Sequence, residues 1–370
     1  MDKLIIKKYG INGEGIGYLN KKPVFVEGTL VDEEVMVEVS ERKPTYMKAQ
    51  LVKIVKPSKE RITPPCDNID ECGGCTLMHT GIVNQGRIKV GLLQESLEKY
   101  AGIKAHSVVY HRNPKPLEYR NQLKMPVSYL DGKIVAGFYK PNTRYFIPVN
   151  HCIIHDPKLE AMRKAVLEVL NQQNVSVYEK GKREGLRFLV LRILNQQIQC
   201  TLVTSQYTIS KEVIDALRQL DLVSVHQSIN TSAKGAEIIV LPLKKLYGKD
   251  AITFNVNKIK ASAHPYSFYQ LNTIQAAHLY KEVEKLIRPC SMIVEAYSGL
   301  GIMSLMVSTK AETIVGCDIN EPSIRNANSN AALNRIENVK FSVSDSAEFL
   351  KRVSKKQEID YVIVDPPRIG

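Results

Sequence analysis

Residues 292–301, Met-Ile-Val-Glu-Ala-Tyr-Ser-Gly-Leu-Gly, decide the fold class of this chain. The apolar run over residues 292–297 has strand length and ends in a glycine-containing turn, after which a helix is expected through Lys310. A second strand is predicted over residues 313–317. Strands and helices that alternate in this way are typical of a parallel, doubly wound α/β sheet.

The ends of these strands suggest a nucleotide site. Asp318 follows the second strand, 19 residues after Gly299, a spacing at which a carboxylate can accept hydrogen bonds from a ribose diol. Ser304 stands where a dinucleotide fingerprint has its third glycine, so a nicotinamide enzyme is only one alternative. A later strand, residues 361–364, which we expect to be the fourth of this sheet, runs into the rigid loop 365–368, Asp-Pro-Pro-Arg. Such loops are typical of methyltransferases that act on planar nitrogen or base substrates, and not of dehydrogenases.

Three domains are expected along the 370 residues. Residues 1–57 alternate in short β-type runs that suit an OB-like barrel, and residues 56–58 resemble a linker. Residues 58–262 are mostly short strands, with helices expected near 84–100, 158–171 and 210–219, and predict a central α+β domain. Residues 263–370 hold the α/β pattern, which makes the chain a multidomain α/β protein.

The charge of the chain points to an anionic partner. It has 51 Lys and Arg against 38 Asp and Glu, a net charge of +13. Residues 81–150 alone hold eleven Lys or Arg and four Asp or Glu, interleaved with aromatic residues. Cations can meet phosphates while aromatic rings stack on unpaired bases, so this stretch suits RNA, although a solvated face over a β-rich core would have the same composition.

No membrane or secreted class is indicated. The first ten residues, MDKLIIKKYG, lack the pattern of a secretory signal, and no apolar run reaches the roughly 18 residues that a membrane span needs. We therefore expect a cytoplasmic protein that does not enter membranes. We also expect a monomer. In a reducing compartment, clustered cysteines indicate a metal or catalytic site before they indicate disulfides.

The cysteines have such a cluster. Cys66, Cys72 and Cys75 follow the spacing C-x5-C-x2-C, and Cys152 stands alone further on. Four thiolates can hold either a zinc ion or a [4Fe-4S] cluster, and the absence of a second C-x2-4-C pair favours iron–sulfur over a zinc ribbon. The other three cysteines lie in apolar contexts typical of core residues.

Taken together, these features resemble the RNA uracil-5-methyltransferase family. The chain has a TRAM-type barrel, the C-x5-CGGC cluster with a distal Cys, a YRN segment (119–121), a YQLN segment (269–272), the EAYSG loop (295–299) and the DPPR motif (365–368), in the family's order. The resemblance extends over essentially the whole chain. It implies that the C-terminal domain is a Rossmann-like methyltransferase domain.

The resemblance also implies the ligands. Cys66, Cys72, Cys75 and Cys152 would hold a structural [4Fe-4S] cluster. S-adenosylmethionine would be the cofactor, and RNA, with 23S rRNA preferred to tRNA, would be the partner. The residues expected at the cofactor or the flipped base are Gln270, Glu295, Tyr297, Gly299, Asp318 and Asp365. The candidates for RNA contact are Arg120, Asn121, Lys124, Lys140, Arg144 and Phe268.

The family's chemistry requires residues that this sequence does not contain. In the family, a Cys thiolate adds to uracil C6 and a Glu acts as base, and both lie beyond the DPPR motif. Since the sequence ends at Gly370, we expect a methyltransferase domain truncated after its fourth strand and a chain that does not turn over. The alternatives are an iron–sulfur RNA-binding protein without catalysis, which would not bind S-adenosylmethionine, and a tRNA uridine methyltransferase.

Overall fold

The computed structural model describes residues 1–179, 183–232 and 237–367. The chain forms two compact units, one made of Met1–Pro116 with Tyr139–Ile147 and the other of Leu117–Phe138 with Pro148–Gly370. Within the described ranges, no helix combines the length and the apolarity that a membrane crossing demands.

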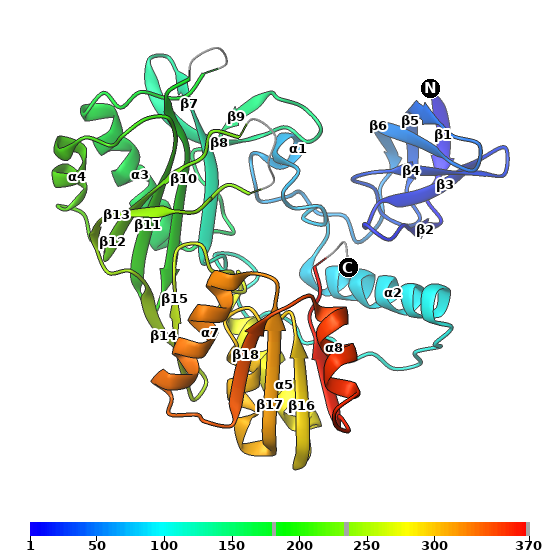
Figure 1. The fold of residues 1–370 in the computed structure, drawn as a ribbon. Coiled ribbons are helices and arrows are strands. Elements are labelled where there is room, and N and C mark those ends of the chain that lie inside the picture. The colour runs from blue at the N-terminus through cyan, green and yellow to red at the C-terminus, as the bar shows by residue number, and fades with distance from the viewer. Residues whose placement is uncertain (180–182, 233–236, 368–370) are drawn as a thin grey trace. The chain divides into compact units, whose positions relative to one another are not determined.

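The first unit begins with a small β-barrel (Figure 1). Strand β1 pairs with β5, and β2, which follows after Ile6 and Lys7, pairs with β3, so the start of the chain joins both edges of the sheet. Alternate side chains such as Val24, Val35 and Val37 fill the interior. This is the predicted OB-like barrel, with its first strand divided in two. Its strands are β1 (Asp2–Ile5), β2 (Lys8–Tyr9), β3 (Gly15–Leu19), β4 (Lys22–Val26), β5 (Glu34–Arg42) and β6 (Met47–Lys56).

A buried ion pair ties the segment after the barrel to the barrel itself. The Glu33 side chain is fully buried, and its carboxylate accepts hydrogen bonds from Arg61 Nη2 at 2.8 Å and from the backbone N–H of Leu30 and Ser58. Arg61 Nη2 also donates to Gly28 O at 2.7 Å. The predicted linker after residue 56 is therefore held against the barrel.

The cysteine-rich loop and a long helix follow the barrel in the first unit. Helix α1 (Ile69–Cys72) ends at Gly73, whose positive φ of 64° is a left-handed helix cap that favours glycine. Helix α2 (Ile82–Ala101) matches the helix predicted at 84–100 and ends at Gly102 in the same conformation.

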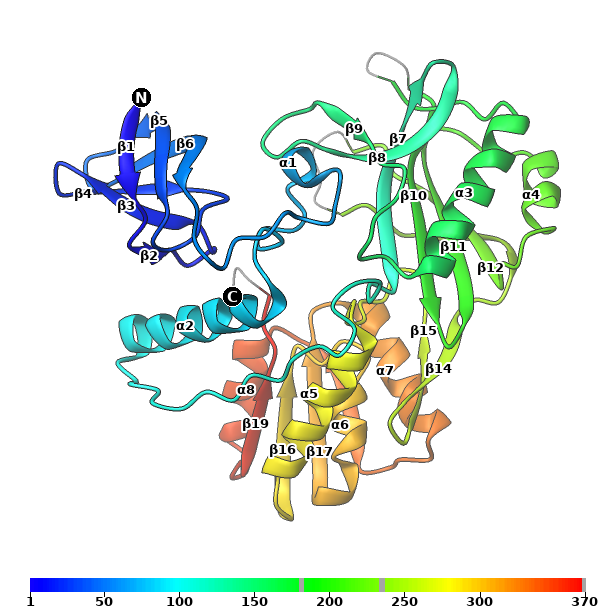
Figure 2. The same cartoon turned by 180° about the vertical axis from the view of Figure 1, so that it is seen from behind.

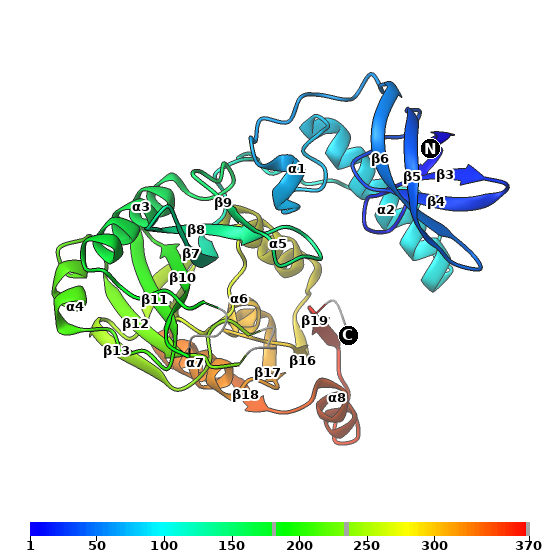
Figure 3. The ribbon, with the colours of Figure 1, turned by 90° about the horizontal axis from the view of Figure 1, so that it is seen from above.

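A seven-stranded sheet dominates the second unit, in the strand order β13-β12-β11-β10-β7-β8-β9. Helices α3 (Pro157–Gln172) and α4 (Lys211–Leu217) cover one face, as Figure 3 shows from above, and Leu159, Leu191 and Leu202 lie in the core between them and the sheet. The strands are β7 (Gln122–Leu130), β8 (Lys133–Tyr139), β9 (Phe146–Pro148), β10 (Gly185–Leu194), β11 (Gln197–Ser205), β12 (Ser224–Ile229) and β13 (Leu243–Gly248).

The other face of this sheet is polar. The strand registers place Lys124, Val190, Thr201, His226 and Lys245 in one row across five neighbouring strands. Burial lowers the pKa of His226 to about 4, so its ring is neutral at pH 7. A sheet face with this composition needs polar segments, rather than a helix with an apolar stripe, to cover it.

A parallel sheet, in the order β18-β17-β16-β19, forms the rest of the second unit. The hairpin of β14 and β15 and helices α5, α6 and α7 share one hydrophobic cluster with it. Figure 2 shows α5 and α6 beside β16 and β17. The elements are β14 (Ile252–Val256), β15 (Ile259–Ala263), α5 (Thr273–Leu286), β16 (Cys290–Ala296), α6 (Ile302–Met306), β17 (Ala311–Asp318), α7 (Glu321–Leu333), β18 (Val339–Val343), α8 (Ser346–Ser354) and β19 (Tyr361–Val364).

Helix α8 packs on the opposite face, where Phe349 contacts Met292, Val294 and Cys317. Helices on both faces of a parallel sheet confirm the predicted doubly wound fold. The helix predicted through Lys310 is shorter than expected, because α6 ends at Met306 and a 3-10 turn follows. The hairpin β14–β15 shares its core with the parallel sheet, whereas the predicted boundary after residue 262 would divide them.

Candidate cofactor site

Most of the predicted site residues of the second unit gather at one edge of the parallel sheet. Tyr297, Asp318 and Asp365 lie at the carboxyl ends of β16, β17 and β19, and Asp345 follows β18 at the same edge. In open α/β sheets, ligands bind outside the carboxyl ends of the strands. Four strands, three of them predicted, thus present polar groups where a ligand is expected.

The turn after β16 has the geometry of a loop that approaches a ligand closely. Tyr297, Gly299 and Gly301 all have positive φ, of 61°, 51° and 73°, and a non-glycine residue in this region stores backbone strain. A Cβ at Gly299 would meet nothing within 4 Å, so open space lies above this glycine. The Gly299 N–H donates to Asp318 Oδ2 at 3.0 Å, which holds the turn against the end of the next strand.

Glu295 is buried below this turn. Ser304 donates to Glu295 Oε2 from its backbone N–H, at 3.0 Å, and from its hydroxyl. Burial, with the added charges of Asp365 and Asp318, raises the pKa of Glu295 to about 7, despite the two hydrogen bonds. The carboxyl group fastens helix α6 to strand β16, so its first role in the structure is to shape the turn.

Gln270 reaches the same edge from the segment before α5. Its Nε2 donates to Asp365 Oδ2 at 3.3 Å. The backbone around it is held by Asn121, whose side-chain Nδ2 donates to Gln270 O at 2.9 Å and whose backbone N–H donates to Leu271 O at 3.0 Å. The YRN segment therefore positions the YQLN segment.

The turn that precedes Gln270 is held by Arg192, on β10. This guanidinium is 5 % exposed and donates to His264 O at 3.1 Å and to Ser267 O at 2.7 Å. With the Gln122 amide turned so that its oxygen faces the guanidinium, that oxygen accepts from Arg192 Nη2 at 2.9 Å. A buried, hydrogen-bonded cation thus fixes residues 264–267 on the polar face of the large sheet.

The chemistry of the edge suits a ligand with hydroxyl groups and positive charge. The Asp318 oxygens each accept one backbone N–H, and Asp365 Oδ2 accepts from the Gln270 side chain, so each of these oxygens keeps a lone pair for a further donor. Ser298 Oγ is buried and, among the described residues, lacks a hydrogen-bond partner. Ribose hydroxyls, an ammonium and a sulfonium would all be favoured here.

Comparison with known proteins identifies the chain. A profile described as "TRAM domain" matches residues 3–52, and one described as "tRNA (Uracil-5-)-methyltransferase" matches residues 88–370. The chain belongs to the RNA uracil-5-methyltransferase family. The S-adenosylmethionine-dependent methyltransferase fold and the TRAM barrel of this family agree with the two units described above.

Relatives and one solved structure support the assignment. A protein of Clostridium tetani named an uncharacterized RNA methyltransferase is 33 % identical over 99 % of this chain and 82 % of its own length. A Bacillus anthracis protein with the same description is 32 % identical over 99 % and 82 %. The crystal structure of Pyrococcus abyssi tRNA (uracil-54, C5)-methyltransferase with S-adenosyl-L-homocysteine has a TM-score of 0.77 and 25 % identity, over 100 % of this chain and 84 % of that one.

The predicted cluster ligands are not assembled as a metal site. Cys66, Cys72 and Cys75 lie in the first unit and Cys152 belongs to the second, and all four are of intermediate exposure. Across the described ranges, no group of three or more His, Cys, Asp or Glu side chains is placed to hold a metal ion. Four thiols have the right donor chemistry for a cluster, but the arrangement of the side chains does not demonstrate one.

Five of the six candidates for RNA contact divide into two groups, and the sixth, Arg120, is of intermediate exposure. Lys124, Lys140 and Arg144 are exposed. Phe268, two residues before Gln270, is 65 % exposed next to the edge of the parallel sheet that carries Tyr297, Asp318 and Asp365, named the cofactor edge from here on. Asn121 is buried and its amide is used inside the protein. Arg368, the last residue of the DPPR motif, lies outside the described residues.

Sequence reasoning missed three contributors to this edge. Arg192 lies in a mostly apolar strand, and a charged residue in such a strand was the one signal that could have identified it. Ser298 was covered by the turn motif without a role of its own. Asp345 caps α8 by accepting from the N–H of Ala347 at 2.9 Å, and an Asp between a strand and a helix is a recognisable N-cap signal.

Replacement of Glu295 should change how stability depends on pH. Its pKa is raised from 4.5 to about 7 in the folded chain, so the folded state binds the proton more tightly and loses stability as pH rises through this window. Glu295→Gln removes this loss. From pH 5 to pH 8, the thermal midpoint of the parent should fall relative to that of the variant by on the order of 5 °C.

Differential scanning fluorimetry at both pH values measures this difference. Glu348→Gln, which replaces an exposed glutamate on α8, is the matched control and should follow the parent. Parallel pH profiles for the parent and Glu295→Gln would show that Glu295 titrates normally.

Proposed function

We propose that this chain binds S-adenosylmethionine and RNA for methylation of a uridine at C5, with large-subunit rRNA as the substrate. The observation that carries the proposal is the edge of the parallel sheet, where the open Gly299 turn, Asp318 and the Gln270–Asp365 pair meet. Family membership supports the reaction class.

The protein's own residues account for cofactor binding. Asp318, with one lone pair on each oxygen used by backbone N–H groups of Gly299 and Asn320, can still accept from the two ribose hydroxyls. Gly299 leaves room for the cofactor to approach the backbone. S-adenosylmethionine supplies a methyl group on a sulfonium, whose positive charge the carboxylates of Asp318 and Asp365 favour.

The choice of rRNA rests on the cysteines. The C-x5-CGGC spacing with a distal Cys goes with the rRNA branch in the family resemblance. The similar Pyrococcus abyssi enzyme is a tRNA (uracil-54, C5)-methyltransferase, so tRNA is the competing substrate.

The uridine chemistry needs a nucleophile that adds to C6 before C5 can accept a methyl group. Cys200 and Cys317 are fully buried, and Cys290 begins β16, at the end of the strand away from the cofactor edge. We therefore propose that none of these thiols is the nucleophile, and that the 370 residues alone bind their ligands without transferring the methyl group.

Asp318→Asn should weaken binding of S-adenosylhomocysteine by at least about tenfold, because a neutral amide is a poorer acceptor for the ribose hydroxyls than a carboxylate. Isothermal titration calorimetry measures the affinity. Glu321→Gln, at an exposed neighbouring position, should bind like the parent.

Thermal unfolding of both variants reports whether the turn stays folded. Equal affinity of Asp318→Asn and parent would contradict the role of Asp318. Failure of the parent to bind S-adenosylhomocysteine would favour the RNA-binding protein without catalysis.

The substrate is tested with transcripts of large-subunit rRNA fragments and of tRNA. We expect the chain to retain rRNA on filters at lower protein concentration than tRNA, and to transfer no tritium from methyl-labelled S-adenosylmethionine to either. Binding should weaken as salt rises, because phosphates are neutralised by Lys and Arg. Labelled RNA would overturn the proposal on the nucleophile, and tighter tRNA binding would overturn the choice of substrate.

We further propose that Cys66, Cys72, Cys75 and Cys152 hold a [4Fe-4S] cluster, because four cysteines, three of them in the C-x5-C-x2-C spacing, match its donor set. Anaerobically purified parent and Cys290→Ser should contain iron and labile sulfide, whereas Cys72→Ser and Cys75→Ser should lose both. Iron and sulfide analysis with the visible spectrum gives the answer. Stoichiometric zinc in a colourless protein would refute the cluster.

A further inference from the structure

A pocket of the second unit lies over the polar face of the large sheet. It has a volume of about 370 Å³. Its lining shares no residue with the cofactor residues described above. The lining residues are Lys124, Glu237, Ile238, Ile239, Val240, Leu241, Tyr266 and Asn320.

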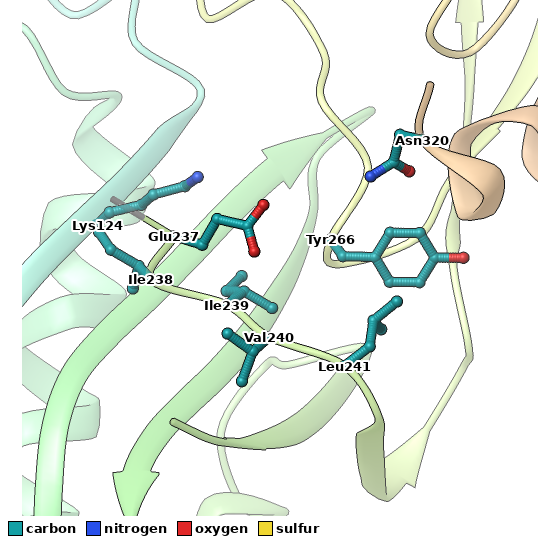
Figure 4. A pocket seen from close by; sticks show the side chains of 8 residues that line it. All are labelled: Lys124, Glu237, Ile238, Ile239, Val240, Leu241, Tyr266 and Asn320. Atoms are coloured by element: carbon teal, nitrogen blue, oxygen red, sulfur yellow. The ribbon is translucent and has the colours of Figure 1, made fainter. Parts of the chain in front are cut away.

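The polar groups of this pocket are arranged on two sides. Figure 4 shows the Lys124 ammonium and the Glu237 carboxylate on one side, and the Tyr266 ring, Leu241 and Asn320 on the other. Within the described parts of the chain, no ion pair or hydrogen bond engages the side chain of Lys124 or Glu237. Two opposite charges therefore face one cavity, both available to a ligand.

Each wall of the pocket is fixed to the scaffold. The segment 237–241 is tied to β12 and the residue after it, because Ser228 Oγ accepts from Val240 N and donates to Val240 O, both at 2.9 Å, and Asn230 Nδ2 donates to Glu237 O at 2.9 Å. Lys124 stands on strand β7 itself.

The remaining walls connect the pocket to the cofactor edge. Tyr266 lies in the turn whose carbonyls Arg192 binds. Asn320 caps α7 by accepting from Ser323 N at 2.9 Å, and its own N–H donates to Asp318 Oδ1 at 2.9 Å. A ligand in this pocket would therefore be near a residue of the cofactor site, in a preorganised cavity.

The donor and acceptor pattern selects one nucleobase. A carboxylate beside an ammonium matches the Watson–Crick edge of guanine, whose N1–H and N2–H donate to the carboxylate while O6 accepts from the ammonium. Adenine, cytosine and uracil each lack two adjacent donors next to an acceptor in this order. The Tyr266 ring and the aliphatic side chains of Ile239 and Leu241 offer apolar surface to the flat base.

We propose that this pocket binds an unpaired guanine of the substrate RNA, apart from the uridine that is methylated. Glu237 accepts from the base, and Lys124 donates to it. This inference rests on the proposed function, since it takes RNA to be the substrate.

The test uses single-stranded RNA nonamers of uridine, labelled with fluorescein, in which one guanosine is moved along the sequence. The whole 370-residue chain is titrated and fluorescence anisotropy is recorded. At one position or more, guanosine should tighten binding about tenfold over the all-uridine nonamer. Inosine, which lacks the N2 amino group, should lose most of this gain at the same position.

Glu237→Gln should reduce the gain to less than twofold, and Lys124→Met should weaken it. Glu212→Gln, at an exposed glutamate on α4, should leave it unchanged. No gain at any position, an equal gain with adenosine, or a gain unaffected by Glu237→Gln would overturn the proposal.

The failure of this proposal differs from that of the proposed function. If S-adenosylhomocysteine and the all-uridine nonamer bind but guanosine has no effect, the pocket proposal alone fails. If neither S-adenosylhomocysteine nor any RNA binds, the proposed function fails with it.

Discussion

The buried guanidinium of Arg192 is the constraint on which the second unit depends. It reaches from the polar face of the seven-stranded sheet to the carbonyls of His264 and Ser267, just before the helix that leads to the parallel sheet. Loss of one of these acceptors would leave a guanidinium N–H buried without a hydrogen bond, which costs about 1–3 kcal/mol. The cofactor edge and the guanine pocket both lie next to the turn that this cation holds.

Two asparagine side chains also hold irregular segments in place through hydrogen bonds to the backbone. Asn121 fixes the backbone of Gln270 from the other sheet, and Asn320 joins the cap of α7 to Asp318. In both cases a short polar side chain satisfies backbone groups of a segment that has no regular hydrogen-bonding partner. The site is therefore built on irregular segments that a rigid polar scaffold holds in place, rather than on helices alone.

Much of this architecture could be predicted from local patterns. Strand β19 and helix α2 were predicted within two residues. The spacing of Gly299 and Asp318 suggested a ribose-binding carboxylate, and the hydrogen bond between the two residues is an observation that the spacing did not predict. The role of Asn121 could not be read, because its partner lies 149 residues away in the chain. The early end of α6 was missed for another reason, since residues 302–310 contain no Gly or Pro that would signal a helix end. The pocket around Glu237 brings together Lys124, Tyr266 and Asn320 from segments far apart in the chain, which local periodicity does not reveal.

The ion pair between Glu33 and Arg61 determines how long a segment the barrel needs when it stands in another protein. The barrel ends at Lys56, yet the charge that neutralises its buried Glu33 comes from the segment after it. A piece cut at residue 57 would keep an uncompensated carboxylate in its interior. The segment that could be transferred between proteins is therefore longer than the barrel. A transferred barrel would need Arg61 as well, or another residue in place of Glu33.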